Sequence, residues 1–194
     1  MILAKHGSKA TIGLWFVAML VIGIALLEKH TIPVAAPRKT DTAVLAREIE
    51  ALRDRPEDRR WMLVHVLSSG CRCSARIADH LAGSKRPEDV VEKVVLVGES
   101  AEIQQRLSRF DVAVVTEAEL LERFHVEGAP LLIVAAPDAS LRYVGGYTDR
   151  KQGPAPQDRP IFEALRSGRE VAPLPSFGCT VDARMRSTND IGQP

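Results

Sequence analysis

The chain has 194 residues, and its 26 Lys and Arg against 25 Asp and Glu leave a formal net charge of +1 at pH 7. With 45% hydrophobic and 26% charged residues, the composition is that of a folded protein rather than a disordered chain. The near-zero charge excludes broad electrostatic attraction to nucleic acid, and three cysteines are too few for a disulfide-stapled scaffold.

The first feature along the chain is a run without charge. Residues 10–27 are 18 mostly apolar positions that contain no Asp, Glu, Lys or Arg. A membrane helix needs about 17–25 residues, whereas the apolar core of a cleaved signal peptide has about 7–15. The pattern predicts an uncleaved signal-anchor, one transmembrane helix over 10–27. A cleaved signal peptide with its site near Ala35 and Ala36, or a buried core helix, are the alternatives.

The charges around this run predict its orientation. Lys5 and Lys9 precede it, within residues 1–9, whereas Glu28 and Lys29 cancel each other after it. Positive charge is retained on the cytoplasmic side of membranes, so residues 1–9 should be cytoplasmic and the remainder of the chain exported. In a bacterium this describes a single-pass inner-membrane protein whose domain lies in the periplasm, where thiols meet oxidising conditions.

The exported part divides into three segments. Residues 28–40 contain two prolines and no apolar period, which predicts a linker. Residues 41–167 alternate between helical and strand-like patterns and should form one folded domain. Residues 168–194 are expected to be an irregular tail that contains Cys179.

Within the domain, each expected strand is a short apolar run and each expected helix has apolar residues at helical spacing. In chain order we expect a helix over 41–54, a strand over 61–67, a turn over 68–74 leading into a short helix, a strand over 90–97, a helix over 101–110, a strand over 112–115, a helix over 117–124, a hairpin of strands 131–135 and 141–144, and a helix over 160–166. Helices separate the first three strands, so these should pair in parallel, and the hairpin must be antiparallel. The prediction is a mixed β-sheet with helices on both faces.

Three local features accompany this order. Cys71 and Cys73 lie in the turn between the first strand and the next helix, Gly128-Ala129-Pro130 opens a later strand, and a hairpin with a Pro-Asp turn follows. In this arrangement the chain resembles the thioredoxin-like thiol–disulfide oxidoreductases, and among them the membrane-anchored proteins of the bacterial envelope. The resemblance covers about residues 58–167 and implies a thioredoxin-like α/β fold.

The resemblance also implies a site. It places redox chemistry at Cys71 and Cys73, and it implies a cis-proline at Pro130 that shapes a substrate groove together with Ala129. The family usually has two residues between its cysteines and a Trp before the first, whereas this chain has only Arg72 between them and no such Trp. The implied partners are envelope protein thiols or a redox partner protein, and exchange between thiols needs no cofactor.

The two thiols have an environment suited to exchange. A cysteine at a helix N-terminus has its thiolate stabilised by the helix dipole and by free backbone N–H groups, and Arg72 adds positive charge. Either thiol can then attack while the other resolves the mixed disulfide. By position in the resembled fold, Cys73 matches the buried resolving cysteine and Cys71 the exposed one.

Two alternatives stay open. Cys71, Cys73 and Cys179, with His80 on the helix after the turn, form a ligand set suited to zinc or an iron–sulfur cluster. The other alternative is a redox-inactive thioredoxin-like interaction module. In the tail, Phe177-Gly178-Cys179 predicts a point that docks onto the domain. There Cys179 would be a third redox thiol, a metal ligand or a buried apolar side chain.

Overall fold

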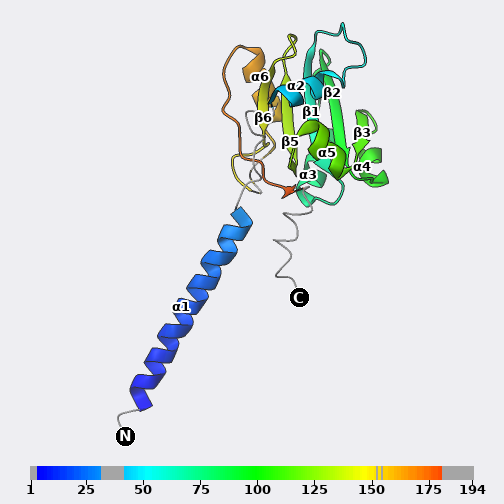
Figure 1. The fold of residues 1–194 in the computed structure, drawn as a ribbon. Helices are drawn as coiled ribbons and strands as arrows, with labels where there is room; N and C mark the ends of the chain where they lie inside the picture. The colour runs from blue at the N-terminus through cyan, green and yellow to red at the C-terminus, as the bar shows by residue number, and fades with distance from the viewer. Residues whose placement is uncertain (1–3, 32–41, 152, 154, 181–194) are drawn as a thin grey trace. The chain divides into compact units, whose positions relative to one another are not determined.

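The structure is a computed structural model, and it describes residues 4–31, 42–151, 153 and 155–180. The chain divides into two units, Met1–Ile32 and Pro33–Pro194. In the first unit, helix α1 (Ala4–Thr31) contains the predicted segment 10–27 (Figure 1). α1 continues to Thr31, so it includes the first four residues of the predicted linker 28–40. The remainder of that linker lies outside the described residues.

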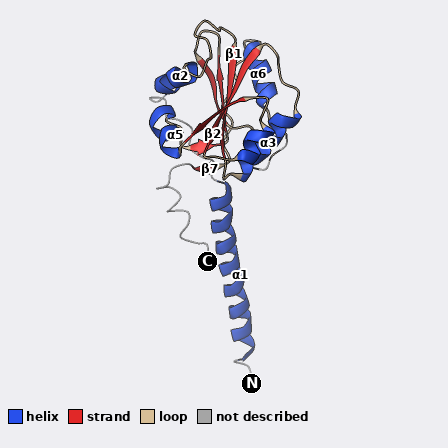
Figure 2. Cartoon of the chain, turned by 90° about the vertical axis from the view of Figure 1, so that its right-hand side faces the viewer, coloured by secondary structure: helices blue, strands red, loops and turns tan. Residues whose placement is uncertain are grey.

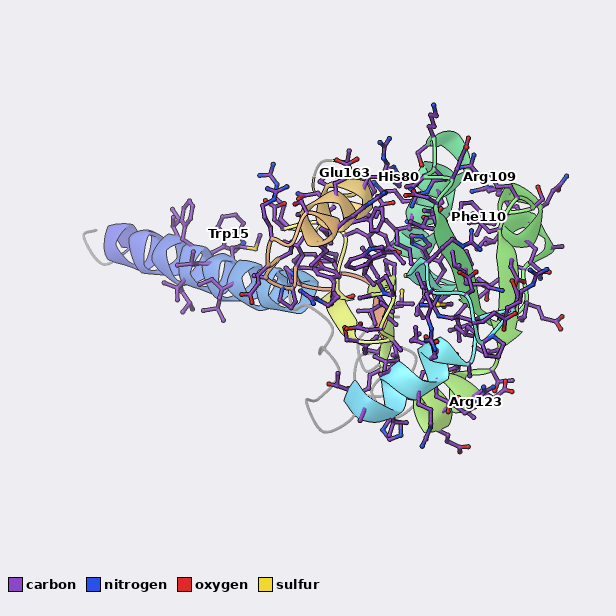
Figure 3. All side chains as sticks on the ribbon, turned by 90° about the horizontal axis from the view of Figure 1, so that it is seen from above. Trp15, His80, Arg109, Phe110, Arg123 and Glu163 are labelled. Carbon is purple, nitrogen blue, oxygen red and sulfur yellow. The ribbon has the colours of Figure 1, made fainter. Side chains whose placement is uncertain are left out.

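The described side chains of α1 are those of residues 11–24, and they are almost all exposed. They include Trp15 (Figure 3). Its ring meets the ring of Phe16 edge to face, with the centroids 5.2 Å apart. Within the part of the chain that the structure describes, no helix combines the length and the apolar character needed to cross a membrane.

The second unit is built on a five-stranded sheet with the order β3-β2-β1-β5-β6. β1 pairs in parallel with β2, and β2 with β3, whereas β5 is antiparallel to both β1 and β6. This confirms the predicted mixed sheet. The strands are β1 (Trp61–Ser68), β2 (Val90–Val97), β3 (Asp111–Val115), β5 (Leu131–Ala135) and β6 (Leu141–Gly145).

Helices cover both faces of this sheet. Figure 2 shows α2 and α5 on one side and α3 and α6 on the other. Val64 and Val66 of β1 pack in the core on the α2 and α5 side, whereas Leu63 and Leu67 pack in the core formed with α3, α4 and α6. Because β1 is buried on both faces, its sequence is a continuous apolar run. The helices are α2 (Thr42–Glu50), α3 (Arg72–Gly83), α4 (Ala101–Arg106), α5 (Glu117–Phe124) and α6 (Asp158–Arg166).

Three helices differ from their predicted bounds. α2 ends at Glu50 instead of residue 54, because turns closed by the Leu52 and Arg53 amides on the Ile49 and Glu50 carbonyls replace its last part. α4 ends at Arg106 instead of residue 110, because a turn closed by the Phe110 amide and the Leu107 carbonyl at 2.8 Å replaces its last part. α6 begins at Asp158 rather than at Pro160. A proline is tolerated there because the first amides of a helix have no intrahelical partner.

Within the described part of the tail, residues 179 and 180 form a short strand instead of the irregular conformation expected there. β4 (Gly128–Ala129) pairs antiparallel with β7 (Cys179–Thr180), and together they form a separate two-stranded sheet. This pairing brings the end of the described chain to the loop before Pro130. The predicted docking of residues 177–179 is therefore confirmed.

Candidate functional site

Cys71 lies where β1 gives way to α3. It is the N-cap of that helix, with φ −107° and ψ 119°, and its carbonyl accepts the Ala75 amide at 3.0 Å. The Cys71 amide donates to the Ser68 carbonyl at 3.2 Å, and the Ser68 amide donates to Ser74 Oγ at 3.0 Å. These bonds tie the end of the strand to the first turn of the helix and hold Cys71 at the helix N-terminus.

The loop before β5 reaches this thiol. The Ala129–Pro130 peptide bond is cis, as expected, and Cys71 Sγ lies 3.7 Å from the Ala129 carbonyl oxygen. Cys73 and Pro130 line one cavity. The cis bond implied at Pro130 is therefore confirmed, and the proline loop lies within reach of a cysteine side chain, as expected.

The two thiols of the motif differ in burial, in the opposite sense to the prediction. Cys71 is only 2% exposed, whereas Cys73 is half-buried. The assignment of Cys73 as the buried thiol and Cys71 as the exposed one is wrong. The reason is that the Cys71 side chain lies against Ala129, while residues two apart on a helix point to different sides and Cys73 faces the cavity.

The thiolate belongs to Cys71. A side-chain hydrogen bond from Cys179 is the largest of the effects that lower the pKa of Cys71, to about 5, and the backbone at Ser74 and Cys73 contributes in the same direction against the effect of burial. Burial and the negative charge of Cys71 raise the pKa of Cys73. At neutral pH the site therefore holds one thiolate beside a protonated thiol.

Cys179 is the third sulfur of the site. In the register of β4 and β7 it is the partner of Ala129, the residue whose carbonyl lies against Cys71. Its side chain is exposed, so the predicted alternative of a buried apolar cysteine is wrong. Periodicity gave no signal for this placement, and only the Phe-Gly pair before Cys179 pointed to docking.

The cavity beside Cys73 has a volume of about 390 Å³. Its walls include Cys73, Arg76, Ile77, Pro130, Tyr147 and Phe177. The charges of Lys151 and Arg76 act on Cys73 in the direction that lowers its pKa, although the opposing effects outweigh them. The hollow next to the cysteines is therefore largely apolar, with positive charge close to the Cys73 sulfur.

His80 pairs with the start of α6. Its Nε2 lies 2.8 Å from Asp158 Oδ1, at the start of α6 (Figure 3). Among the residues that the structure describes, no group of three or more His, Cys, Asp or Glu side chains is placed to hold a metal ion. The ligand set suggested for zinc or an iron–sulfur cluster, Cys71, Cys73 and Cys179 with His80 as a possible fourth ligand, is therefore not assembled among these residues.

A buried ionic cluster beside the sheet was missed by the sequence analysis. Arg86 forms ion pairs with Glu92 and, at 2.6 Å, with Asp158, and all three side chains are at most 9% exposed. Burial raises the pKa of Glu92, but hydrogen bonds from Arg86 and His65 outweigh it and lower that pKa to about 2. His65 Nδ1 also lies 2.8 Å from the Tyr147 hydroxyl, and Tyr147 lines the cavity. The one available signal was a Glu within the apolar strand 90–97.

No protein-family profile and no curated protein sequence matches the chain. Among solved structures, it resembles the hypothetical protein SMc02350 from Sinorhizobium meliloti 1021, with a TM-score of 0.54 and 18% identity over 64% of this chain and 80% of that one. It also resembles an uncharacterized conserved protein from Geobacillus kaustophilus, with a TM-score of 0.51 and 18% identity over 65% of this chain and 78% of that one. For a secreted disulfide oxidoreductase of Mycobacterium tuberculosis, the TM-score is 0.40 and the identity 11%, over 57% of this chain and 84% of that one.

These findings define the class of fold. The strand order, the cysteines between β1 and α3, and the cis-proline before β5 agree with the arrangement that the resemblance implied. The second unit is a mixed α/β domain of thioredoxin-like fold. The first two structural similarities show that this fold is shared with those proteins.

Proposed function

We propose that the second unit carries out thiol–disulfide exchange, with Cys71 as the attacking thiolate and Cys73 as the second thiol of the motif. The observation that carries this proposal is the position of Cys71. Its sulfur lies at the N-terminus of α3 and 3.7 Å from the carbonyl of the residue before the cis-proline. A thiolate is the nucleophile in thiol–disulfide exchange, and a helix N-terminus favours its formation.

The same loop supports a polypeptide substrate. Gly128 and Ala129 pair with an extended segment, residues 179–180, by antiparallel backbone pairing. Backbone pairing to a short strand accepts many sequences, because the hydrogen bonds come from the main chain. We therefore propose protein thiols or protein disulfides of the envelope, or a redox partner protein, as the molecules that exchange with Cys71.

Replacing Cys71 by Ser tests the proposed function. Reduction of a peptide disulfide by the full chain should fall to the uncatalysed rate, because a hydroxyl does not replace a thiolate in this reaction. Cys73→Ser is the matched control and should still form a mixed disulfide at Cys71, seen by mass spectrometry. Full activity in Cys71→Ser would contradict the proposal, and no exchange by the unaltered chain would favour a redox-inactive interaction module.

Location is a separate proposal, which rests on the sequence alone. We propose that residues 10–27 anchor the chain in the bacterial inner membrane, with residues 1–9 cytoplasmic and the second unit in the periplasm. Alkaline phosphatase fused after Pro194 should then be active, because this reporter works only when exported. Activity of a reporter that functions only in the cytoplasm, fused at the same position, would contradict this topology.

A further inference from the structure

The segment that ends at β7 lies along the loop around the cis-proline. The Leu174 carbonyl accepts the Gly146 amide at 2.8 Å, and Ser176 Oγ donates to the Pro130 carbonyl at 2.6 Å. Beyond these contacts, Thr180 pairs with Gly128 in the two-stranded sheet. Residues 174–180 are thus held at one end by Gly146, after β6, and at the other by the pairing with β4, with the Ser176 side chain bonded to Pro130 between them. The paired end, residues 179–180, lies where the proposed function puts a substrate strand.

Glycine allows this close fit. A Cβ added to Gly178 would lie 1.8 Å from the Ala129 carbonyl oxygen, and a Cβ added to Gly146 would lie 1.9 Å from the Pro175 carbonyl oxygen. At both points backbone contacts backbone, with no room for a side chain. The contact therefore depends on the particular residues of this tail and of the loop that receives it.

The docked segment delivers a thiol to Cys71. Cys179 is paired with Ala129, and its side chain is the hydrogen-bonding neighbour with the largest effect on Cys71. Cys71 is buried whereas Cys179 is exposed. An approaching disulfide therefore meets Cys179 and its strand before it meets the reactive sulfur.

We propose that Cys179 is the resolving thiol of this site, and that its strand occupies the peptide-binding edge of the cis-proline loop until a substrate strand displaces it. This inference rests on the proposed function and assigns the second half of the exchange to the tail. Cys73 is then a protonated thiol beside Cys71, on the side of the cavity, and is not the resolving thiol.

The reaction balances as two exchanges. The Cys71 thiolate attacks one sulfur of a protein disulfide, forms a mixed disulfide and releases the other substrate sulfur, which takes the proton of Cys179. Once the tail docks again on β4, the Cys179 thiolate attacks Cys71 Sγ, forms the Cys71–Cys179 disulfide and releases the second substrate sulfur as a thiolate. One substrate disulfide has been reduced and two protein thiols oxidised. A dithiol partner reverses both steps.

Geometry favours Cys179 over Cys73 for this step. A disulfide from Cys71 to Cys73 would close across Arg72, and Arg72 and Cys73 are the first two residues of α3. Closing that ring would distort the first turn of the helix, since disulfides accept a narrow range of geometry. Cys179 lies on an extended strand outside the helix, so its approach leaves α3 intact.

Disulfide mapping tests the assignment. The reduced full chain is treated with oxidised glutathione, the remaining thiols are alkylated, and the disulfides are located by mass spectrometry. We expect a Cys71–Cys179 disulfide both in the unaltered chain and in Cys73→Ser. In Cys179→Ala, the mixed disulfide of glutathione with Cys71 should accumulate, and release of the second glutathione should be lost.

Gly178→Ala keeps all three thiols and should slow the internal disulfide, because its Cβ would collide with Ala129. Gly83→Ala is the matched control, since a Cβ there meets nothing within 4 Å, and it should behave as the unaltered chain. A Cys71–Cys73 disulfide as the main product, or normal glutathione release in Cys179→Ala, would overturn the inference and leave the proposed function standing. No exchange by the unaltered chain would overturn both.

Discussion

Alkylation of Cys71 by iodoacetamide should reach half its maximal rate near pH 5. The pKa of this thiol is lowered to about 5, chiefly by the hydrogen bond from Cys179, and only the thiolate reacts. A lowered pKa means that the thiolate is present above that pH. The rate should therefore be flat from about pH 6 upward and should fall about tenfold per pH unit below 5. Mass spectrometry of the Cys71 peptide after timed quenching measures the alkylation rate at each pH.

Two variants make this measurement specific. Cys179→Ala removes the largest cause of the low pKa and should move the midpoint of Cys71 alkylation to higher pH. Cys73→Ser leaves that hydrogen bond in place, and its midpoint should stay near that of the unaltered chain. A midpoint close to about 8.5, the ordinary value of a cysteine, in the unaltered chain would show that Cys71 is not activated.

Replacing Arg86 by Met should lower the free energy of unfolding by about 3–5 kcal/mol, the range for removing one partner of a buried ion pair. Arg86 lies between Glu92 and Asp158, whose side chains are 8% and 0% exposed. Without it, two buried carboxylates lose their main counter-charge. Urea unfolding of the full chain at pH 7, followed by circular dichroism, measures the loss.

Arg106→Met is the control, because Arg106 pairs with Asp79 and Glu102 at the exposed surface. This substitution should lower the free energy of unfolding by less than about 1 kcal/mol, as is typical of surface ion pairs.

The ionic cause also predicts how the stability lost in Arg86→Met depends on pH. The lowered pKa values of Glu92 and Asp158 stabilise the unaltered chain above the ordinary carboxylate pKa, and this contribution is lost as pH falls toward 2. The difference in free energy of unfolding between the unaltered chain and Arg86→Met should therefore become smaller as the pH falls. A difference that stays constant with pH would argue against the ionic cause.

Local signals in the sequence were enough for much of the fold. The predicted bounds of α5 agree with the structure because Thr116 and Glu119 form a capping box that marks its start. β5 was found at its observed bounds because it is a continuous apolar run that follows Pro130. β2 was found because all of its residues except Glu92 and Lys93 are apolar and Gly98 follows it. The cis Pro130 beside the cysteines followed from the order of these elements and the family resemblance.

Other features depend on contacts that no local pattern reports. Arg86 and Asp158 are 72 positions apart, so their charges looked like ordinary solvated side chains. The relative burial of Cys71 and Cys73 depends on how α3 is rotated against the loop at Ala129, which spacing alone does not determine. Likewise β7 has two residues, too few for any periodicity to show.

The pairing of β7 with β4 has a further consequence for competition. A segment tethered to its own binding edge acts at an effective concentration that reaches the millimolar range for short flexible linkers. A free peptide present at micromolar concentration must therefore bind that edge about a thousandfold more tightly than the tail to occupy it equally. Partners that first bind elsewhere on the domain gain the same tethered advantage. The docked tail thus sets the affinity that a ligand needs in order to bind the edge of β4. Weakly binding peptides do not displace the tail, whereas proteins that also bind a second surface of the domain do.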